Sequence, residues 1–258
     1  LWTLEGLDAV NPEILTRALA DRSLHIRKAA IRLSEPFVHE PAVAGKVLAL
    51  AEDERIEVRR QLLFSLGEGK GGAFEQTMVR LLFRDVAQPI MLEAALSGLR
   101  DREFRLFELL LNDPSWNQER PGFARLFSAL SHAVINSGRQ DDLERLLTQI
   151  SDSAGRPRWA RLAVLEGLAA AKKRGLARLP VALAALGKSA EDSVRARADA
   201  FGKTWTAPVP AAAAPEPRSR RVGAGFDKGQ SLFAICSACH GVDGKGQPTI
   251  APSLAESL

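Results

Sequence analysis

The chain has 258 residues, of which 46% are hydrophobic and 26% are charged, so it is long enough for two ordinary domains and apolar enough to bury a core. Its formal net charge is only +4, and charges of both signs are spread along the chain, which argues against nucleic acid as the main partner. Both cysteines fall within one short motif near the C-terminus, so the chain has no disulfide framework.

The first residues, "LWTLEGLDAV", contain neither a methionine nor a basic region of the kind that opens a secretory signal. We find no apolar run of the about 20 residues that a membrane span requires. Both ends of the sequence look cut, so we expect an internal fragment of a longer protein, with no membrane span in this part of it.

The first hundred residues contain three segments that align without gaps at a period of 32 residues. Each unit predicts a helix, a short turn at an aspartate and a second helix. The turn aspartate can accept hydrogen bonds from the free N–H groups at the start of the second helix. The aligned positions include Asp21, Asp53 and Asp85; Ile26, Val58 and Ile90; and Leu15, Val47 and Val79.

A weaker echo of the pattern comes later. "LWTLEGLDA" at 1–9 resembles "LAVLEGLAA" at 162–170, an offset close to five periods, and 185–205 supplies another turn and second helix. Residues 101–157 are irregular but helix-rich, with a loop expected at 112–122. Because a single short helix pair cannot bury its own apolar face, helix pairs at a fixed period predict a stacked solenoid over residues 1–205.

This pattern resembles HEAT and armadillo-like repeats, in which an aspartate in the turn is followed by Val-Arg in the second helix. Asp21 precedes Ile26-Arg27, and Asp53 precedes Val58-Arg59. The resemblance implies a ladder of Asp–Arg contacts between neighbouring repeats. Methionine 91 stands at the arginine position of the third unit, so we expect the ladder to break there. An unrelated α-helical domain with a chance period is the alternative.

No side chain of the predicted solenoid indicates a catalytic or metal-binding role. His25, His39 and His132 are scattered and lack partners at metal-ligand spacing. Met78 and Met91 lie at or beside core positions, and the aromatic residues are interpreted as packing. We therefore interpret this region as a scaffold that supplies a surface and a spacer.

The composition changes abruptly after Trp205. Four prolines within ten residues prevent a helix from continuing and favour an extended tether. We predict three parts: a solenoid at 1–205, a Pro/Ala-rich linker at 206–223 and a haem-binding domain at 224–258.

Cys236-Ser-Ala-Cys239-His240 is the attachment signature for a c-type haem. Two thiols separated by two residues can add across the two vinyl groups of haem, and the next residue, His240, can then ligate the iron. Two other uses of Cys-x-x-Cys stay open. A thioredoxin-like redox pair needs a preceding β-strand, whereas "FDKGQSLFAI" favours a helix, and a structural zinc site needs four ligands, of which only three are local.

The surrounding residues resemble the N-terminal half of a class I cytochrome c domain over about 225–258. Before the motif stand Gly229, Leu232 and Phe233, and after it comes His-Gly-x-x-Gly-x-Gly at 240–246. "APSL" at 251–254 matches the family loop, which implies that the carbonyl of Pro252 accepts a hydrogen bond from the second nitrogen of His240. No methionine follows the motif, so the resemblance implies a truncated domain whose sixth iron ligand lies elsewhere.

The order of parts is similar to that of large bacterial extracytoplasmic proteins in which a dehydrogenase propeller precedes a HEAT-type solenoid and a cytochrome c domain. The resemblance implies one-electron transfer by a single covalent haem c. It also implies a redox partner protein or a fused sugar or alcohol dehydrogenase, and a periplasmic or cell-surface location. The fragment itself is not expected to be catalytic. The alternative is a protein-interaction scaffold with the cytochrome as an appendage.

Overall fold

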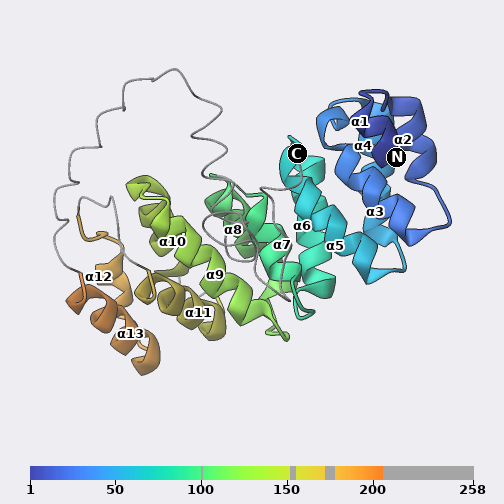
Figure 1. The fold of residues 1–258 in the computed structure, drawn as a ribbon. Coiled ribbons are helices and arrows are strands. Elements are labelled where there is room, and N and C mark those ends of the chain that lie inside the picture. Colours follow the sequence, from blue (N-terminus) through green and yellow to red (C-terminus); the bar gives the residue numbers. More distant parts are fainter. Residues whose placement is uncertain (100, 152–154, 172–177, 206–258) are drawn as a thin grey trace, which may run out of the picture. The chain divides into compact units, whose positions relative to one another are not determined.

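A computed structural model describes residues 1–99, 101–151, 155–171 and 178–205. They belong to the first of two compact units, Leu1–Pro208 (Figure 1). The described residues form α-helices and 3-10 helices and contain no strand, which confirms the all-α prediction. The predicted linker at 206–223 and the predicted haem-binding segment at 224–258 lie outside the described residues.

Six helix pairs follow a short first helix within the described part of the chain. The first helix is α1 (Trp2–Gly6). The pairs are α2 (Pro12–Ala18) with α3 (Leu24–Leu33), α4 (Pro41–Ala49) with α5 (Ile56–Ser65), α6 (Gly72–Asp85) with α7 (Met91–Ser97), α8 (Glu103–Asn112) with α9 (Phe123–Asn136), α10 (Gln140–Ser151) with α11 (Arg158–Ala169), and α12 (Leu183–Leu186) with α13 (Asp192–Lys203). The 3-10 helices are η1 (Glu35–Phe37), η2 (Leu50–Glu52), η3 (Leu66–Glu68) and η4 (Pro114–Asn117).

Like helices pack on like helices along the array. The first helices make one layer, in which α2, α4, α6, α8, α10 and α12 each contact the next. The second helices make the other layer, with close packing of α3 on α5, α5 on α7, α9 on α11 and α11 on α13. The pair α7 and α9 is the exception, because its packing is sparse. Each pair therefore buries its apolar face against its neighbours, as the repeat pattern predicts.

The turn aspartates of the first two pairs accept backbone hydrogen bonds at the entry to the second helix, close to the predicted place. Asp21 Oδ1 accepts a hydrogen bond from the backbone N–H of Ser23 at 2.7 Å, and Asp53 Oδ1 accepts one from Arg55 at 2.9 Å. Ser23 and Arg55 are the residues directly before α3 and α5. The donor is thus the residue that precedes the helix, one position earlier than the sequence pattern indicates.

The third pair departs from the aligned pattern. Ile90, which aligns with the fully buried Val58, has a φ of 69° and is 48% exposed. A β-branched side chain in the left-handed region is unusual, and this conformation delays the start of α7 until Met91. The predicted core position therefore moves by one residue, and Met91 becomes fully buried in its place.

Aromatic side chains dominate the core at the middle of the array. The predicted loop at 112–122 contains η4, whose Trp116 is only 2% exposed and stacks on Phe123 with ring centroids 4.2 Å apart. Phe127 packs edge-on against Trp159 of α11 at 5.0 Å. The prediction that these aromatic residues serve packing is confirmed, whereas the expected loop is partly a core element.

Helices α9 and α11 approach each other closely because Gly167 has no side chain. A Cβ built at Gly167 would lie 1.9 Å from the backbone oxygen of Ser128. At the same crossing the hydroxyl of Ser131 donates to the backbone oxygen of Val164 at 3.1 Å. Gly6, the matching glycine of the sequence echo, has no atom within 4 Å of such a Cβ. The shared Leu-Glu-Gly-Leu therefore has a packing role only in α11.

Substitution of Gly167 by alanine should destabilise the array by about 3 kcal/mol or more, since a methyl group cannot enter without moving two helix backbones apart. The matched change Gly45→Ala, in the exposed interior of α4 with open space around it, should stabilise by about 0.5–1 kcal/mol through helix propensity. Urea unfolding followed by circular dichroism checks both. Equal effects of the two changes would contradict the close crossing.

Candidate functional site

The residues predicted to bind haem, Cys236, Cys239, His240 and Pro252, all lie outside the described residues. Within the described part, His25 and His39 are exposed and His132 is half-buried. No group of three or more His, Cys, Asp or Glu side chains in that part is placed to hold a metal ion.

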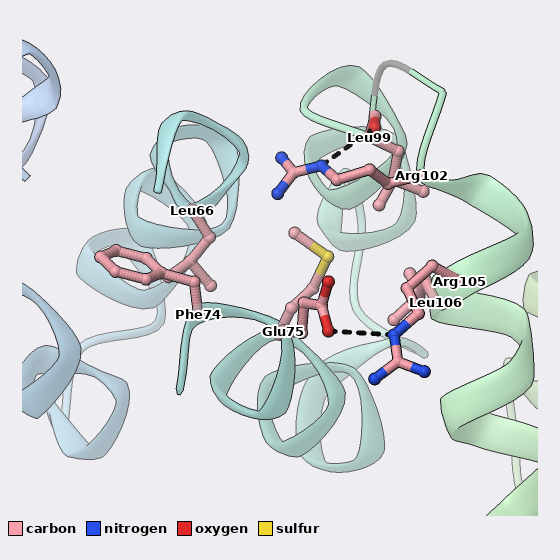
Figure 2. A pocket seen from close by; sticks show the side chains of 8 residues that line it. Leu66, Phe74, Glu75, Leu99, Arg102, Arg105 and Leu106 are labelled. Atoms are coloured by element: carbon pink, nitrogen blue, oxygen red, sulfur yellow. Dashed lines mark hydrogen bonds and ion pairs between the residues drawn. The ribbon is translucent and has the colours of Figure 1, made fainter. Parts of the chain in front are cut away.

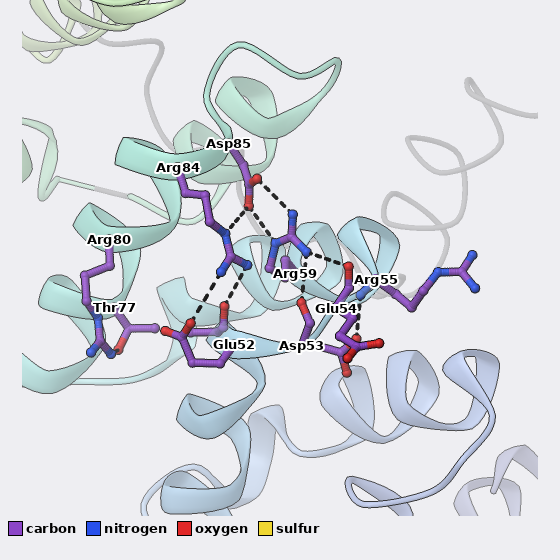
Figure 3. A network of polar contacts seen from close by, with 10 residues as sticks. Glu52, Asp53, Glu54, Arg55, Arg59, Thr77, Arg80, Arg84 and Asp85 are labelled. Atoms are coloured by element: carbon purple, nitrogen blue, oxygen red, sulfur yellow. Dashed lines mark hydrogen bonds and ion pairs between the residues drawn. The ribbon is translucent and has the colours of Figure 1, made fainter.

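Ion pairs of Arg27 and Arg59 join consecutive turns in the first three helix pairs, and Figure 3 shows the buried pair of Arg59. Arg59 binds Asp85 through two parallel hydrogen bonds, Nε to Oδ2 at 2.6 Å and Nη2 to Oδ1 at 2.8 Å. Arg27 binds Asp53 in the same way at 2.7 and 3.1 Å. Each arginine is the fourth residue of a second helix, and each aspartate lies 26 residues later in the next turn. These contacts form the expected Asp–Arg ladder.

The remaining terminal nitrogen of each arginine donates hydrogen bonds to the turn that precedes its own helix. Arg59 Nη1 donates to the backbone oxygens of Asp53 and Glu54 at 2.9 and 3.0 Å, and Arg27 Nη1 donates to that of Asp21 at 2.8 Å. One guanidinium therefore satisfies the carbonyls of one turn and the carboxylate of the next. The planar fork of arginine suits this geometry, whereas the point charge of lysine does not.

Burial and pairing act in opposite directions on the pKa of Asp85. Burial alone would raise that pKa, but the hydrogen bonds and positive charge of Arg59, together with those of Arg84 at 3.3 Å, hold it below its ordinary value. The hydrogen bonds that Arg59 donates to Asp85 in turn raise the pKa of Arg59. Both groups are therefore charged in the folded protein, and the pair is structural.

The ladder stops at the third pair, as predicted, because Met91 stands at the arginine position and is fully buried. It resumes at Arg161, which sequence comparison missed. Arg161 is the fourth residue of α11 and 1% exposed, and its Nη1 lies 3.1 Å from Glu191 Oε1 while its Nε donates to Ile150 O at 3.1 Å. The shared helix position of Arg27 and Arg161 is the signal that identifies it.

Two hollows open in the described part between helices. Figure 2 shows a small one between α6, α8 and η3, where Arg105 pairs with Glu75 at 3.3 Å and Arg102 donates to the Leu99 carbonyl at 3.4 Å. Its free volume of about 10 Å³ suits one water molecule at most. The other is a hollow of about 440 Å³ between α1 and η1, bordered by Trp2 and Phe37.

An apolar groove of about 450 Å³ lies between α7, α9 and α11. Its lining includes Leu92 and Leu96 of α7, Ala129 and Ala133 of α9, and Gly167 of α11. The groove and both hollows are lined by apolar and polar side chains, and no group of three or more His, Cys, Asp or Glu among the described residues is placed there to hold a metal ion.

Residues 226–257 match the model of the family described as Cytochrome c. The match includes the Cys-x-x-Cys-His motif and indicates haem-based electron transfer for that segment. Comparison with the curated proteins and with the solved structures finds no significant match. None of the described helices combines the length and the apolar character that crossing a membrane requires.

Replacement of Arg59 by methionine should lower the free energy of unfolding by about 3 kcal/mol, because the buried Asp85 then loses its two-bond partner and keeps only Arg84 at 3.3 Å. The matched change Arg55→Met removes an exposed pair with Glu57 and should have little effect. Thermal and urea unfolding of the two variants checks this. A loss that is equally small in both would mean that the ladder does not support the array.

The stability contributed by Asp85 should depend on pH in one direction. Since its pKa is lower in the folded state, the contribution is complete above the ordinary carboxyl pKa of about 4 and is lost as the pH falls through the folded value. The difference in unfolding free energy between wild type and Asp85→Asn should therefore be largest at neutral pH and shrink below about pH 4. Urea titrations from pH 7 to pH 2.5 measure it, with the exposed Glu13→Gln as control. A difference that stayed constant with pH would contradict the pairing.

Proposed function

We propose that this chain carries one covalently attached haem c on a helical-repeat scaffold and serves one-electron transfer. The observation that carries the proposal is Cys236-Ser-Ala-Cys239-His240 within the segment that matches the Cytochrome c family. A thioredoxin-like pair or a zinc site would use the same cysteines but gains no support from that match.

The donor set fits a c-type haem. Cys236 and Cys239 offer two thiols at the spacing that forms two thioether bonds, and His240 offers an imidazole directly after the second thiol. When bound, the haem supplies an iron that cycles between the ferric and ferrous states. The chain's own residues would anchor and orient it: the His240 imidazole would ligate the iron, and the Pro252 carbonyl would accept a hydrogen bond from the N–H of the other ring nitrogen. That hydrogen bond fixes the tautomer and increases the basicity of His240.

The scaffold is proposed to be a HEAT/armadillo-like repeat array. Its support is the 32-residue period, the stacking of like helices and the arginines that bind the next turn, Arg27, Arg59 and, through a glutamate, Arg161. The array has no chemistry of its own among its described residues. Its proposed role is that of a spacer for the haem-bearing segment or of a docking surface for a protein that exchanges electrons with it.

We propose the larger protein that contains this chain from the order of its predicted solenoid, linker and haem-binding domain. The intact protein is a larger extracytoplasmic dehydrogenase, or a partner of one, located in the periplasm or at the cell surface, where haem is attached to Cys-x-x-Cys-His in bacteria. The second candidate is a protein-interaction scaffold with the cytochrome as an appendage, and the apolar groove between α7, α9 and α11 favours it. Unlike electron transfer, the scaffold function should survive the loss of Cys236.

The chain, exported to an oxidising compartment together with haem-attachment machinery, should retain haem after acid–acetone extraction. Its pyridine haemochrome spectrum should show the α-band of two thioether bonds, shifted in Cys236→Ser, which keeps only one. The double variant Cys236→Ser, Cys239→Ser should lose covalent haem while its helical circular dichroism stays unchanged.

Absence of haem in the wild-type chain, with zinc or two free thiols in its place, would overturn the electron-transfer function. Haem that survives in the double variant would also overturn it, because attachment would then not depend on these thiols. The unchanged circular dichroism of the helical array distinguishes both results from simple misfolding.

A further inference from the structure

The contact between the third and fourth helix pairs is built differently from the others. No ladder contact joins them, since Met91 replaces the arginine and Asn117 stands 32 residues after Asp85. In the second-helix layer, α7 packs only sparsely on α9, and the apolar groove is lined by residues of both helices. α7 is also short, because the left-handed Ile90 delays its start.

The same two pairs remain firmly joined on their other side. In the first-helix layer α6 packs on α8, and Arg105 Nε of α8 lies 3.3 Å from Glu75 Oε2 of α6. Beside the turn, Phe83 contacts Phe123 with ring centroids 5.7 Å apart. A Cβ built at Gly122 would lie 2.9 Å from the backbone nitrogen of Ala87, so the two backbones are in close contact. The joint is therefore closed along one side and open along the other.

The helix pairs on each side of this joint are tied internally. On the N-terminal side, two bidentate ion pairs link α2–α7, those of Arg27 and Arg59. On the C-terminal side, α9 and α11 touch backbone to backbone at Gly167, and Arg161 binds the turn before α13. Movement inside either group would break buried contacts, which is unfavourable. Movement between the groups, on the side of α7 and α9, would break no ladder contact and no close packing of second helices.

We propose that α2–α7 and α8–α13 are two rigid blocks that open and close against each other at this groove, with the packing of α6 on α8 as the pivot. Among the described residues, an ion pair of Glu93 and Arg125 spans the groove, and its side chains are 53% and 58% exposed. An exposed pair of this kind stabilises the closed state only weakly, so open and closed states are both populated. Opening exposes Leu92, Leu96 and Ala129, so the joint controls access to this apolar surface.

The test measures distances across the groove in the full chain. Spin labels are attached through a genetically encoded ketone amino acid at the exposed Ser97 of α7 and Asn136 of α9, which leaves the native cysteines untouched. Pulsed electron resonance should show two distance populations for this pair. The matched pair at Lys28 of α3 and Arg60 of α5, inside the N-terminal block, should show one.

A charge reversal separates opening from label motion. Arg125→Glu sets two like charges across the groove, so the longer-distance population should rise by about twofold or more, and the double swap Glu93→Arg, Arg125→Glu should restore the wild-type ratio. Both positions are exposed, so the fold should tolerate the changes. A single population in wild type, or a ratio that Arg125→Glu leaves unchanged, would overturn the proposal.

Discussion

The buried arginine that binds two turns at once is the interaction on which the regular part of the array depends. Removing a guanidinium and a carboxylate from water is unfavourable unless every polar atom regains a partner. Arg59 meets this condition with Asp85 and the carbonyls of Asp53 and Glu54. Because the carboxylate that Arg59 binds belongs to the next helix pair, the pairs stack in one register. A slip by one residue would leave two charges buried without partners.

Where that interaction is missing, the packing changes in kind. The middle of the array is held by the ring contacts of Trp116, Phe123 and Phe127, which depend on contact area and tolerate small shifts better than a bidentate ion pair does. The same region has sparse second-helix packing and the apolar groove. The proposed joint and the apolar groove thus both lie where the ladder arginine is replaced by Met91.

The array and the haem motif illustrate two separate ways in which a chain acquires function. The described helices bring together packing groups and structural ion pairs but no set of catalytic side chains. The proposed chemistry belongs to a short local motif, Cys236 to His240, whose donor groups are close together in the chain and can be recognised without knowledge of the fold. A scaffold with an adjustable joint would then govern where this electron carrier can reach.

Patterns that are local in the chain could be predicted from the sequence alone: the all-α class, the helix pairs, the break at Met91 and the haem-attachment motif. Each depends on residues within one turn, one helix or one repeat, where spacing determines geometry. The left-handed Ile90, the burial of Trp116 and the backbone crossing at Gly167 were decided by tertiary structure. So was the pairing of Arg161 with Glu191. These features depend on contacts between segments that are far apart in the chain. Where the repeat loses its regular spacing, its sequence pattern no longer predicts which segments come into contact.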